Sequence, residues 1–226
     1  MAFVAARDVS VQAEEYLEAL CRILDRGVLA TPTELARELE IAPPSALGMI
    51  RRMVEQQLLT YARREGAQLT EHGRAAAEAI RRRHRLAERL LTDLLGIPWE
   101  RAHDIACRFE HVIDDEVEGY LASALDHPAT CPHGNPLDVS AKSGWRPLAS
   151  LTVGAIGILR QVIDESEPTL EYLNQMQLRP GARVTVCAEA PFDGPLTIDV
   201  AGERHAIARI MADMLLVELL EAGGAA

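Results

Sequence analysis

The chain has 226 residues, 48% of them hydrophobic, which is enough to fill one large core or two to three small ones and excludes a disordered protein. No stretch approaches the roughly 20 consecutive apolar residues of a membrane span, and residues 1–15 lack the pattern of a signal peptide, so a cytoplasmic protein is expected. The formal net charge of −11 argues against nucleic-acid binding, but residues 26–64 carry more arginine than glutamate, which is compatible with a DNA-binding face.

Three helical segments are predicted in the N-terminal part of the chain. Apolar residues at helical spacing indicate helices over 11–24 and 34–39, and a third helix after the turn at 41–45. Gly27 marks the end of the first helix, and the region around Thr31 is a typical N-cap for the second. Two short helices joined by a tight turn predict a helix-turn-helix.

Two short strands and a long helix follow. Residues 58–64 alternate in strand fashion, residues 65–66 form a turn, and residues 67–70 return, which predicts the wing of a winged helix. A long helix then begins near Thr70 and continues to about Leu95, where a Gly-Ile-Pro sequence ends it.

A further helix is predicted from near Trp99 to about Leu125. Its apolar side chains exceed what a winged-helix domain of one subunit can cover, which favours a symmetric dimer. These side chains are Phe109, Val112, Ile113, Val117 and Tyr120.

The C-terminal part changes character. Residues 127–145 are rich in Pro, Gly, His and Asn and form a connector without helical periodicity. Short strands at the spacing of a small barrel then follow, at 151–163, 182–188, 196–200 and 205–208. The last six residues are expected to be frayed.

The four cysteines are scattered without any CxxC pair, so the sequence indicates neither a zinc ribbon nor a disulfide framework. We expect them to be reduced. They are Cys21, Cys107, Cys131 and Cys187.

Metal-binding side chains recur at helical spacing between residues 84 and 111. His84 and Glu88 are four residues apart, and a second set at i, i+4, i+7 and i+8 covers an arc of roughly 100° on a helix. Imidazole, thiolate and carboxylate together suit a divalent first-row transition ion rather than calcium or magnesium. Each residue alone could instead be a solvated or locally paired group. The second set is His103, Cys107, Glu110 and His111.

With these motifs behind a winged helix, the chain resembles the diphtheria toxin repressor family of metal-dependent transcriptional repressors. The likeness extends over nearly the whole chain, including a C-terminal segment similar to the SH3-like domain of ferrous-iron transport protein A. Further matching motifs are Tyr16-Leu17-Glu18-Ala19, Pro43-Pro44-Ser45, Leu69-Thr70-x-x-Gly73-Arg74 and Cys131-Pro132-His133-Gly134-Asn135-Pro136.

The resemblance implies an α+β protein of three domains. These are a winged helix-turn-helix DNA-binding domain over 1–74, a helical metal-binding and dimerisation domain over 75–145, and a small SH3-like β-barrel over 146–226. The implied partners are a double-stranded palindromic DNA operator and a second copy of the chain, and the implied cofactor is Mn(II) or Fe(II), at about two ions per subunit. The genes controlled would be those of metal homeostasis.

The resemblance also implies two metal sites. The primary site would use Cys107, Glu110 and His111 with Glu15 from the first helix. The ancillary site would use His84, Glu88 and His103, completed from the connector and the barrel. Cys131 and His133 match a Cys-x-His of some manganese-responsive relatives, although a simple loop turn is the alternative. A carboxylate of the barrel is expected to complete the ancillary site, and three acidic residues lie near the right position: Asp164, Glu165 and Glu167. We predict Asp164 and Glu167 as the ligands.

Glu15 departs from the family pattern. Iron-type members carry methionine there, and a carboxylate shifts preference toward manganese, while Cys107 favours softer ions. The sequence therefore leaves Mn(II) and Fe(II) both open.

Several residues of the winged helix are candidates for DNA contact, with arginines facing phosphates. Gly48 stands where a relative has a base-contacting glutamine, so direct readout of bases is expected to be thin. A solvated helix face is the alternative for the two helical arginines. The candidates are Thr33, Pro44, Ser45, Arg51, Arg52, Arg63 and Arg64.

Two other function classes are alternatives to a metal-dependent repressor. A metal-dependent hydrolase is disfavoured because the chain has no HExxH, nucleophile elbow or glycine-rich phosphate loop. A metal-independent winged-helix regulator would need an apolar ligand pocket in place of the metal-binding residues.

Overall fold

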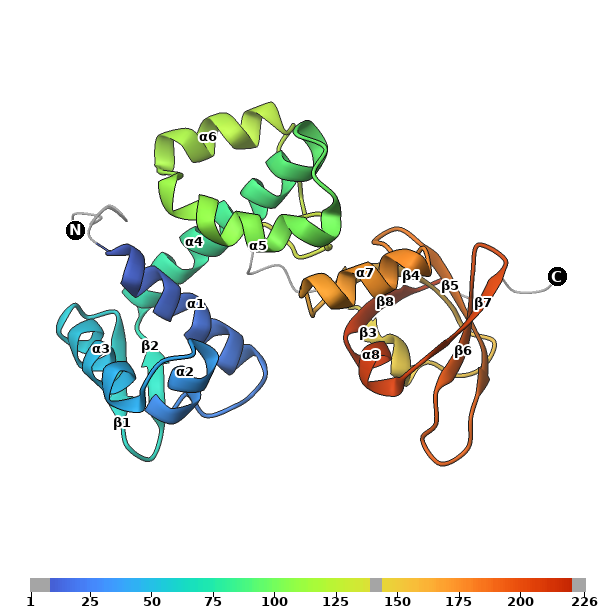
Figure 1. The fold of residues 1–226 in the computed structure, drawn as a ribbon, viewed down its shortest axis with the longest axis horizontal. Helices are drawn as coiled ribbons and strands as arrows, with labels where there is room; N and C mark the ends of the chain where they lie inside the picture. The colour runs from blue at the N-terminus through green and yellow to red at the C-terminus, as the bar shows by residue number, and fades with distance from the viewer. Residues whose placement is uncertain (1–8, 139–143, 221–226) are drawn as a thin grey trace. The chain divides into compact units, whose positions relative to one another are not determined.

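The computed structural model describes residues 9–138 and 144–220, which form two compact units (Figure 1). The first unit contains residues up to 83 together with 110–115, and the second contains 84–109 and the residues from 116 onward. Among the described residues, no helix is both long enough and apolar enough to cross a membrane.

The first unit is a winged helix-turn-helix. Its elements are α1 (Val11–Asp25), α2 (Pro32–Glu38), α3 (Pro43–Glu55), β1 (Leu59–Ala62), β2 (Gly66–Leu69) and the first part of α4 (Glu71–Arg89). Local sequence explains the helix starts, because the Ser10 and Thr31 hydroxyls accept hydrogen bonds from the N–H groups of Ala13 and Glu34. The predicted helix-turn-helix and wing are confirmed.

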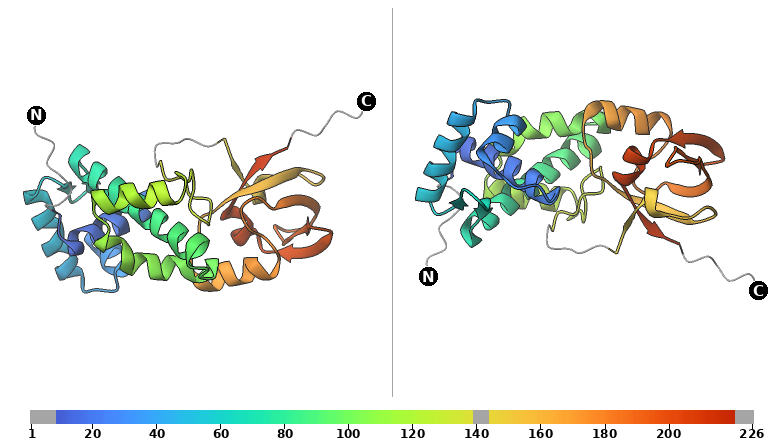
Figure 2. Two further views of the ribbon diagram at one scale, coloured as in Figure 1. Left: turned by 90° about the horizontal axis from the view of Figure 1, so that it is seen from above. Right: turned by 90° about the horizontal axis from the view of Figure 1, so that it is seen from below.

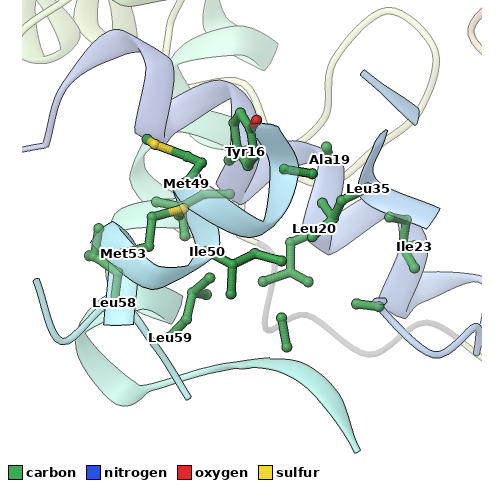
Figure 3. Close-up of a cluster of buried hydrophobic side chains, with 14 of the residues drawn as sticks. Tyr16, Ala19, Leu20, Ile23, Leu35, Met49, Ile50, Met53, Leu58 and Leu59 are labelled. Carbon is green, nitrogen blue, oxygen red and sulfur yellow. The ribbon is translucent and has the colours of Figure 1, made fainter. Parts of the chain in front are cut away.

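Side chains from three helices and the wing fill the core of this unit. Figure 3 shows α1, α2 and α3 contributing to one buried cluster beside the hairpin. Leu20 of α1 and Ile50 of α3 are completely buried in it. This packing holds α3, the second helix of the helix-turn-helix, in a fixed position on α1 and α2.

The second unit begins with the C-terminal turns of α4 and continues through a π-helical turn, η2 (Leu90–Leu94), into α5 (Trp99–Phe109). The predicted single helix over 99–125 is wrong. The chain leaves α5 for a 3-10 turn, η3 (Glu110–Val112), and starts again as α6 (Asp115–Ala124). Aspartate favours helix starts over helix interiors, which fits a break at Asp114 and Asp115.

A six-stranded antiparallel sheet forms the rest of the second unit. Its strand order is β3-β8-β4-β5-β6-β7, with α7 and α8 beside it. The elements are β3 (Arg146–Pro147), η4 (Leu148–Ser150), β4 (Ile156–Val162), α7 (Glu167–Gln175), β5 (Arg183–Glu189), β6 (Leu196–Val200), β7 (Glu203–Ile207), α8 (Arg209–Asp213) and β8 (Leu215–Leu219). The α+β class is confirmed, while α7, α8, β3 and β8 were missed. The frayed tail predicted over 221–226 and residues 139–143 of the predicted connector lie outside the described residues.

The core of the sheet extends to α5. Trp99, the first residue of α5, is buried in the same cluster as Leu159 of β4 and Leu170 of α7. In both views of Figure 2, α7 (orange) lies beside α5 (green). The helical part and the sheet of this unit therefore share a hydrophobic core, which positions side chains of α5 near the end of β4.

Candidate metal centre

The largest group of metal-binding side chains lies in the second unit and begins on α4. His84 and Glu88 are one helical turn apart, with His84 Nε2 3.0 Å from Glu88 Oε1. From α5, His103 Nδ1 lies 3.3 Å from Glu88 Oε1 and 3.1 Å from His84 Nε2. Glu88 is completely buried, so its carboxylate stands among imidazoles and out of water.

The connector supplies Cys131 and His133. His133 Nδ1 is 3.2 Å from Glu88 Oε1, and Cys131 Sγ is 3.9 Å from His133 Nδ1. Arg89 holds this segment against α4 by donating from Nε to the Thr130 carbonyl at 2.7 Å and from Nη2 to the Cys131 carbonyl at 3.2 Å.

Gly134 allows the connector to lie directly on β4. It has a φ of +89°, and a Cβ there would be 1.8 Å from the carbonyl oxygen of Arg160. Next to it, the Val162 N–H donates to the His133 carbonyl at 2.9 Å. A side chain at position 134 is therefore excluded both by the backbone conformation and by the close approach.

The last member of the group is Glu165, from the turn between β4 and α7. Its Oε2 is 3.2 Å from His103 Nδ1, and its Oε1 is 3.2 Å from His133 Nδ1. The Asn135 amide also donates to Oε1. These six side chains form what we call the six-residue cluster: His84, Glu88, His103, Cys131, His133 and Glu165.

Asp164 and Glu167, chosen from the sequence as barrel ligands, are not in the cluster. Asp164 accepts hydrogen bonds from the Ser166 N–H at 3.1 Å and the Thr169 hydroxyl at 2.7 Å, which ties it to the start of α7. Glu167 is the first residue of α7, with Oε1 3.8 Å from Arg101 Nε. A Pro in the first turn of a helix is a start signal, so Pro168 could have marked Glu167 as the first residue of α7 and left Glu165, in the turn before it, as the ligand.

The carboxylates of the cluster are held ionised by the imidazoles. Burial by itself raises the pKa of Glu88, but His84, His103 and His133 outweigh burial and hold this pKa well below its usual range. Burial and the neighbouring Glu88 both act to raise the pKa of Glu165, yet His103 and His133 lower it to about 2. The side chains of the cluster thus form a largely buried network of ion pairs.

The pKa values of the imidazoles and thiols are shifted as well. Burial acts to lower the pKa of His103, but hydrogen bonds with Cys107, Glu165 and Glu88 outweigh it and raise the pKa to about 12. Burial and Glu88 raise the pKa of the Cys131 thiol to about 12. The pKa of Cys107 falls to about 6, because His103 and His84 outweigh the effect of burial.

Three observations indicate that the cluster fits a transition-metal ion. Glu88 Oε2 is buried and has no hydrogen-bond partner among the described residues, so it is available as a ligand. His133 Nε2 is 2.9 Å from the Trp99 carbonyl, an acceptor that holds the proton on Nε2 and leaves Nδ1 to face the carboxylates. The donor atoms fall into groups within 4.8 Å of one another, a spacing that a single ion can span.

Residues of the predicted primary site meet in the first unit. His111 Nδ1 is 2.8 Å from Glu14 Oε2 of α1, and His111 Nε2 is 3.5 Å from Glu110 Oε1. Glu14 and His111 line a cavity together with Arg83 and residues 112–115. The α1 carboxylate in contact with His111 is thus Glu14. Glu15, its neighbour on α1, is exposed and stays a prediction, and Cys107 lies in the second unit, with its Sγ 3.7 Å from His103 Nε2.

The predicted DNA contacts all lie on the surface of the first unit. Those of α3 stand at its N-terminus and along one exposed side, and two arginines stand at the tip of the wing. Gly48 is exposed in the middle of α3. The exposed candidates are Thr33, Pro44, Ser45, Arg51, Arg52, Arg63 and Arg64.

Family models match three consecutive parts of the chain. Residues 8–67 match the iron dependent repressor N-terminal DNA binding domain, 70–137 match the iron dependent repressor metal binding and dimerisation domain, and 146–219 match the FeoA domain.

Individual proteins similar to this chain belong to the same family as the matching models. The iron-dependent repressor IdeR of Mycobacterium tuberculosis is 34% identical over 208 residues, which are 85% of this chain and 90% of the relative. The diphtheria toxin repressor of Corynebacterium jeikeium is 42% identical over 131 residues, 58% of this chain and 55% of the relative. A solved manganese-dependent transcriptional repressor in complex with manganese superimposes with a TM-score of 0.80 at 26% identity, covering 92% of this chain and 99% of the other.

A winged DNA-binding domain joined to a metal-binding and dimerisation domain defines a metal-dependent transcriptional repressor. The chain belongs to the iron-dependent repressor family, whose members include the diphtheria toxin repressor. This membership confirms the predicted family and function class and sets aside the hydrolase and the metal-independent regulator.

Proposed function

We propose that the protein represses metal-homeostasis genes as a homodimer that binds a palindromic operator when Mn(II) or Fe(II) is bound. The observation that carries this proposal is the six-residue cluster, in which Glu88 Oε2 has no hydrogen-bond partner within residues 9–138 and 144–220, in a chain that also has an exposed helix-turn-helix. Because its target is chromosomal DNA, the repressor acts in the cytoplasm.

The two metal sites have different tasks in this proposal. Glu110 and His111, with an α1 carboxylate and Cys107 as predicted further donors, hold the primary ion. The contact between His111 and Glu14 supports this, because it joins residues 110–115 to α1 within the first unit. α1 packs through Leu20 against the core that holds α3, so fixing α1 constrains the recognition helix. A bound ion would act as a Lewis acid that these carboxylates and imidazoles coordinate together, and it would thereby join α1 to residues 110–115.

The dimer places two recognition helices on one face of the DNA. Pro44 and Ser45 stand at the start of α3, where a recognition helix meets base edges, and exposed arginines are suited to phosphates. Two such helices fit half-sites about 34 Å apart, one turn of DNA. Exposed apolar side chains on α5 and α6 support dimerisation, since they would otherwise face water.

Either Mn(II) or Fe(II) fits the donor chemistry. Carboxylates favour Mn(II), whereas the cysteine thiolates favour softer ions. The relatives are named for both: the mycobacterial protein is called iron-dependent and the solved structure manganese-dependent.

The test is operator selection from a random DNA library with Mn(II), followed by titration of the selected DNA at fixed salt, because phosphate contacts make affinity salt-dependent. We expect tight binding with Mn(II) or Fe(II) and its loss with a strong chelator. Binding that survives chelation would overturn the proposal.

Variants test the division of tasks between the sites. Glu110→Ala or His111→Ala should abolish metal-activated DNA binding, whereas His84→Ala should weaken it. His205→Ala, which removes an imidazole on β7 outside both sites, is the control. Equal losses in the first three variants would contradict separate roles.

A further inference from the structure

The donor atoms of the six-residue cluster do not form one set. They fall into two groups of four: His84, Glu88, His103 and Glu165 in one, and Glu88, Cys131, His133 and Glu165 in the other. Only the two carboxylates are shared. We propose that the cluster binds two divalent ions side by side, bridged by Glu88 and Glu165, in place of a single ancillary ion. This inference rests on the proposed function in that it requires metal to bind the cluster.

Glu165 has the geometry of a bridging ligand. Its Oε2 is 3.2 Å from His103 Nδ1 in the first group, and its Oε1 is 3.2 Å from His133 Nδ1 in the second. Cys131 Sγ also lies 3.8 Å from Oε1. A carboxylate that directs one oxygen to each of two groups of donors is placed to bind one ion with each oxygen.

Glu88 lies between the same two groups. Its Oε1 is near His84 at 3.0 Å in the first group and near His133 at 3.2 Å in the second. Its Oε2 is buried without a hydrogen-bond partner in the described part of the chain. Both carboxylates can therefore serve two ions at once, and Glu88 Oε2 makes no hydrogen bond within those residues that would compete with a metal ion.

Ligand distances favour two ions over one ion bound by all six side chains, because the six donor atoms do not all lie within 4.8 Å of one another. Nitrogen, oxygen and sulfur donors lie about 2.0–2.3 Å from a transition ion, so donors on opposite sides of one ion are roughly 4–4.6 Å apart. Each group of four satisfies such a spacing, since its atoms lie within 4.8 Å of one another. Protein sites with two metal ions hold them about 3.5–4 Å apart, a distance that carboxylate bridges span.

The two positions differ in chemistry. The first offers two imidazoles with the shared carboxylates, and the second replaces one imidazole with the Cys131 sulfur. A sulfur also lies beside the first position, because Cys107 groups with His84 and His103 and its Sγ is 3.7 Å from His103 Nε2, so both positions suit Fe(II) or Co(II) as well as Mn(II).

The experiment measures how many ions the full chain binds and whether they interact. Metal-free protein is titrated with Mn(II), bound metal is counted by elemental analysis after dialysis, and the saturated protein is examined by electron paramagnetic resonance. We expect about three ions per chain, one more than a primary and a single ancillary site would bind. We also expect the spectrum of magnetically coupled Mn(II). Saturation at two ions, with the spectrum of isolated Mn(II) alone, would overturn the inference.

Variants assign the ions to the two positions. The double variant Cys131→Ser/His133→Ala should lose one ion and the magnetic coupling while keeping the ion of the first position, and His84→Ala/His103→Ala should do the converse. The control variant Cys187→Ser/His205→Ala removes the same residue types from the sheet and should retain both ions and their magnetic coupling. Weaker binding without any change in ion number, in correctly folded variants, contradicts two positions.

The wild-type measurements separate this inference from the proposed function. If DNA binding depends on metal but the coupled spectrum is absent, only the two-ion cluster is wrong. If DNA binding is unaffected by chelation, the proposed function itself fails.

Discussion

Glu88 shows what a single residue contributes to this molecule. Its carboxylate is completely buried, and three imidazoles compensate the cost of removing that charge from water. The same imidazoles must lose their protons before they can bind a metal ion. The cluster thus resembles a metal site in which protons take the place of the ions, and metal uptake is an exchange of protons for metal.

This exchange gives stability a defined pH dependence. The Glu165 pKa of about 2 is below its usual 4.5, so its stabilisation of the metal-free protein is complete above about pH 4.5 and is lost as pH falls toward 2. The His103 pKa of about 12 is above its usual 6.5, so its contribution is complete below about pH 6.5 and is lost as pH rises toward 12.

We therefore predict that the free energy of unfolding of the metal-free protein, measured by urea denaturation, decreases on acidification below pH 4.5. Glu165→Gln should flatten this decrease, and the exposed Glu167→Gln should leave it unchanged. An identical acid profile in the Glu165 variant would argue that His103 and His133 do not stabilise this carboxylate.

The α1 carboxylates lead to a prediction about metal choice. Glu15→Met replaces an oxygen donor with a thioether and should shift activation of DNA binding from Mn(II) toward Fe(II), Co(II) or Ni(II). Operator affinity against free metal concentration, at fixed salt, measures this ranking. Glu14→Met is the matched variant, since Glu14 contacts His111. If only the Glu14 variant changes the ranking, Glu14 is the ligand.

Sequence reasoning identified five of the six cluster residues and missed Glu165. His84 and Glu88 have a spacing that helix geometry dictates, and His103 belongs to a second set at helical spacing. Cys131 and His133 sit in a short motif that the family resemblance identified. The choice among Asp164, Glu165 and Glu167 depended on where α7 begins, and one residue of error changes which side chain faces the cluster.

Among the elements, the connector depends on glycine at position 134. Gly134→Ala should displace the connector from β4, because the new Cβ has no room beside the Arg160 carbonyl and φ is +89°. We expect loss of the Cys131 thiolate contribution to the absorption spectrum of the Co(II)-loaded protein, together with lower stability. Gly144→Ala is the control, since a Cβ there meets no atom within 4 Å. Unchanged spectra in both variants would contradict the role of Gly134.

Helices and the wing were predicted well because their signals are local. The caps at Ser10 and Thr31 and the Glu65-Gly66 turn are encoded within a few residues. The strand order of the sheet is not local, since β8 pairs with both β3 and β4. The break between α5 and α6 was also missed, because the apolar spacing continues through residues that the chain does not keep helical.

At the level of the whole molecule, apolar side chains on α5 and α6 predict the oligomeric state. Tyr120 is 71% exposed, and Phe109 and Val117 are 38% and 41% exposed, in the domain whose family model is a dimerisation domain. We expect a dimer at micromolar concentration by light scattering, and a monomer for Tyr120→Asp. Phe192→Asp, at an exposed aromatic residue before β6, should stay dimeric. A monomeric wild type with metal present would count decisively against the dimer.

The six-residue cluster gathers ligands from distant points in the chain, between residue 84 on α4 and residue 165 beyond β4. An ion bound there acts as a cross-link that closes long loops, and a covalent cross-link over a loop of such length removes about 4 kcal/mol of entropy from the unfolded chain. Metal supply therefore controls more than operator affinity. The metal-free repressor unfolds more readily and is therefore more exposed to proteases. In a cell short of metal, we expect the amount of repressor to fall as well as its DNA binding.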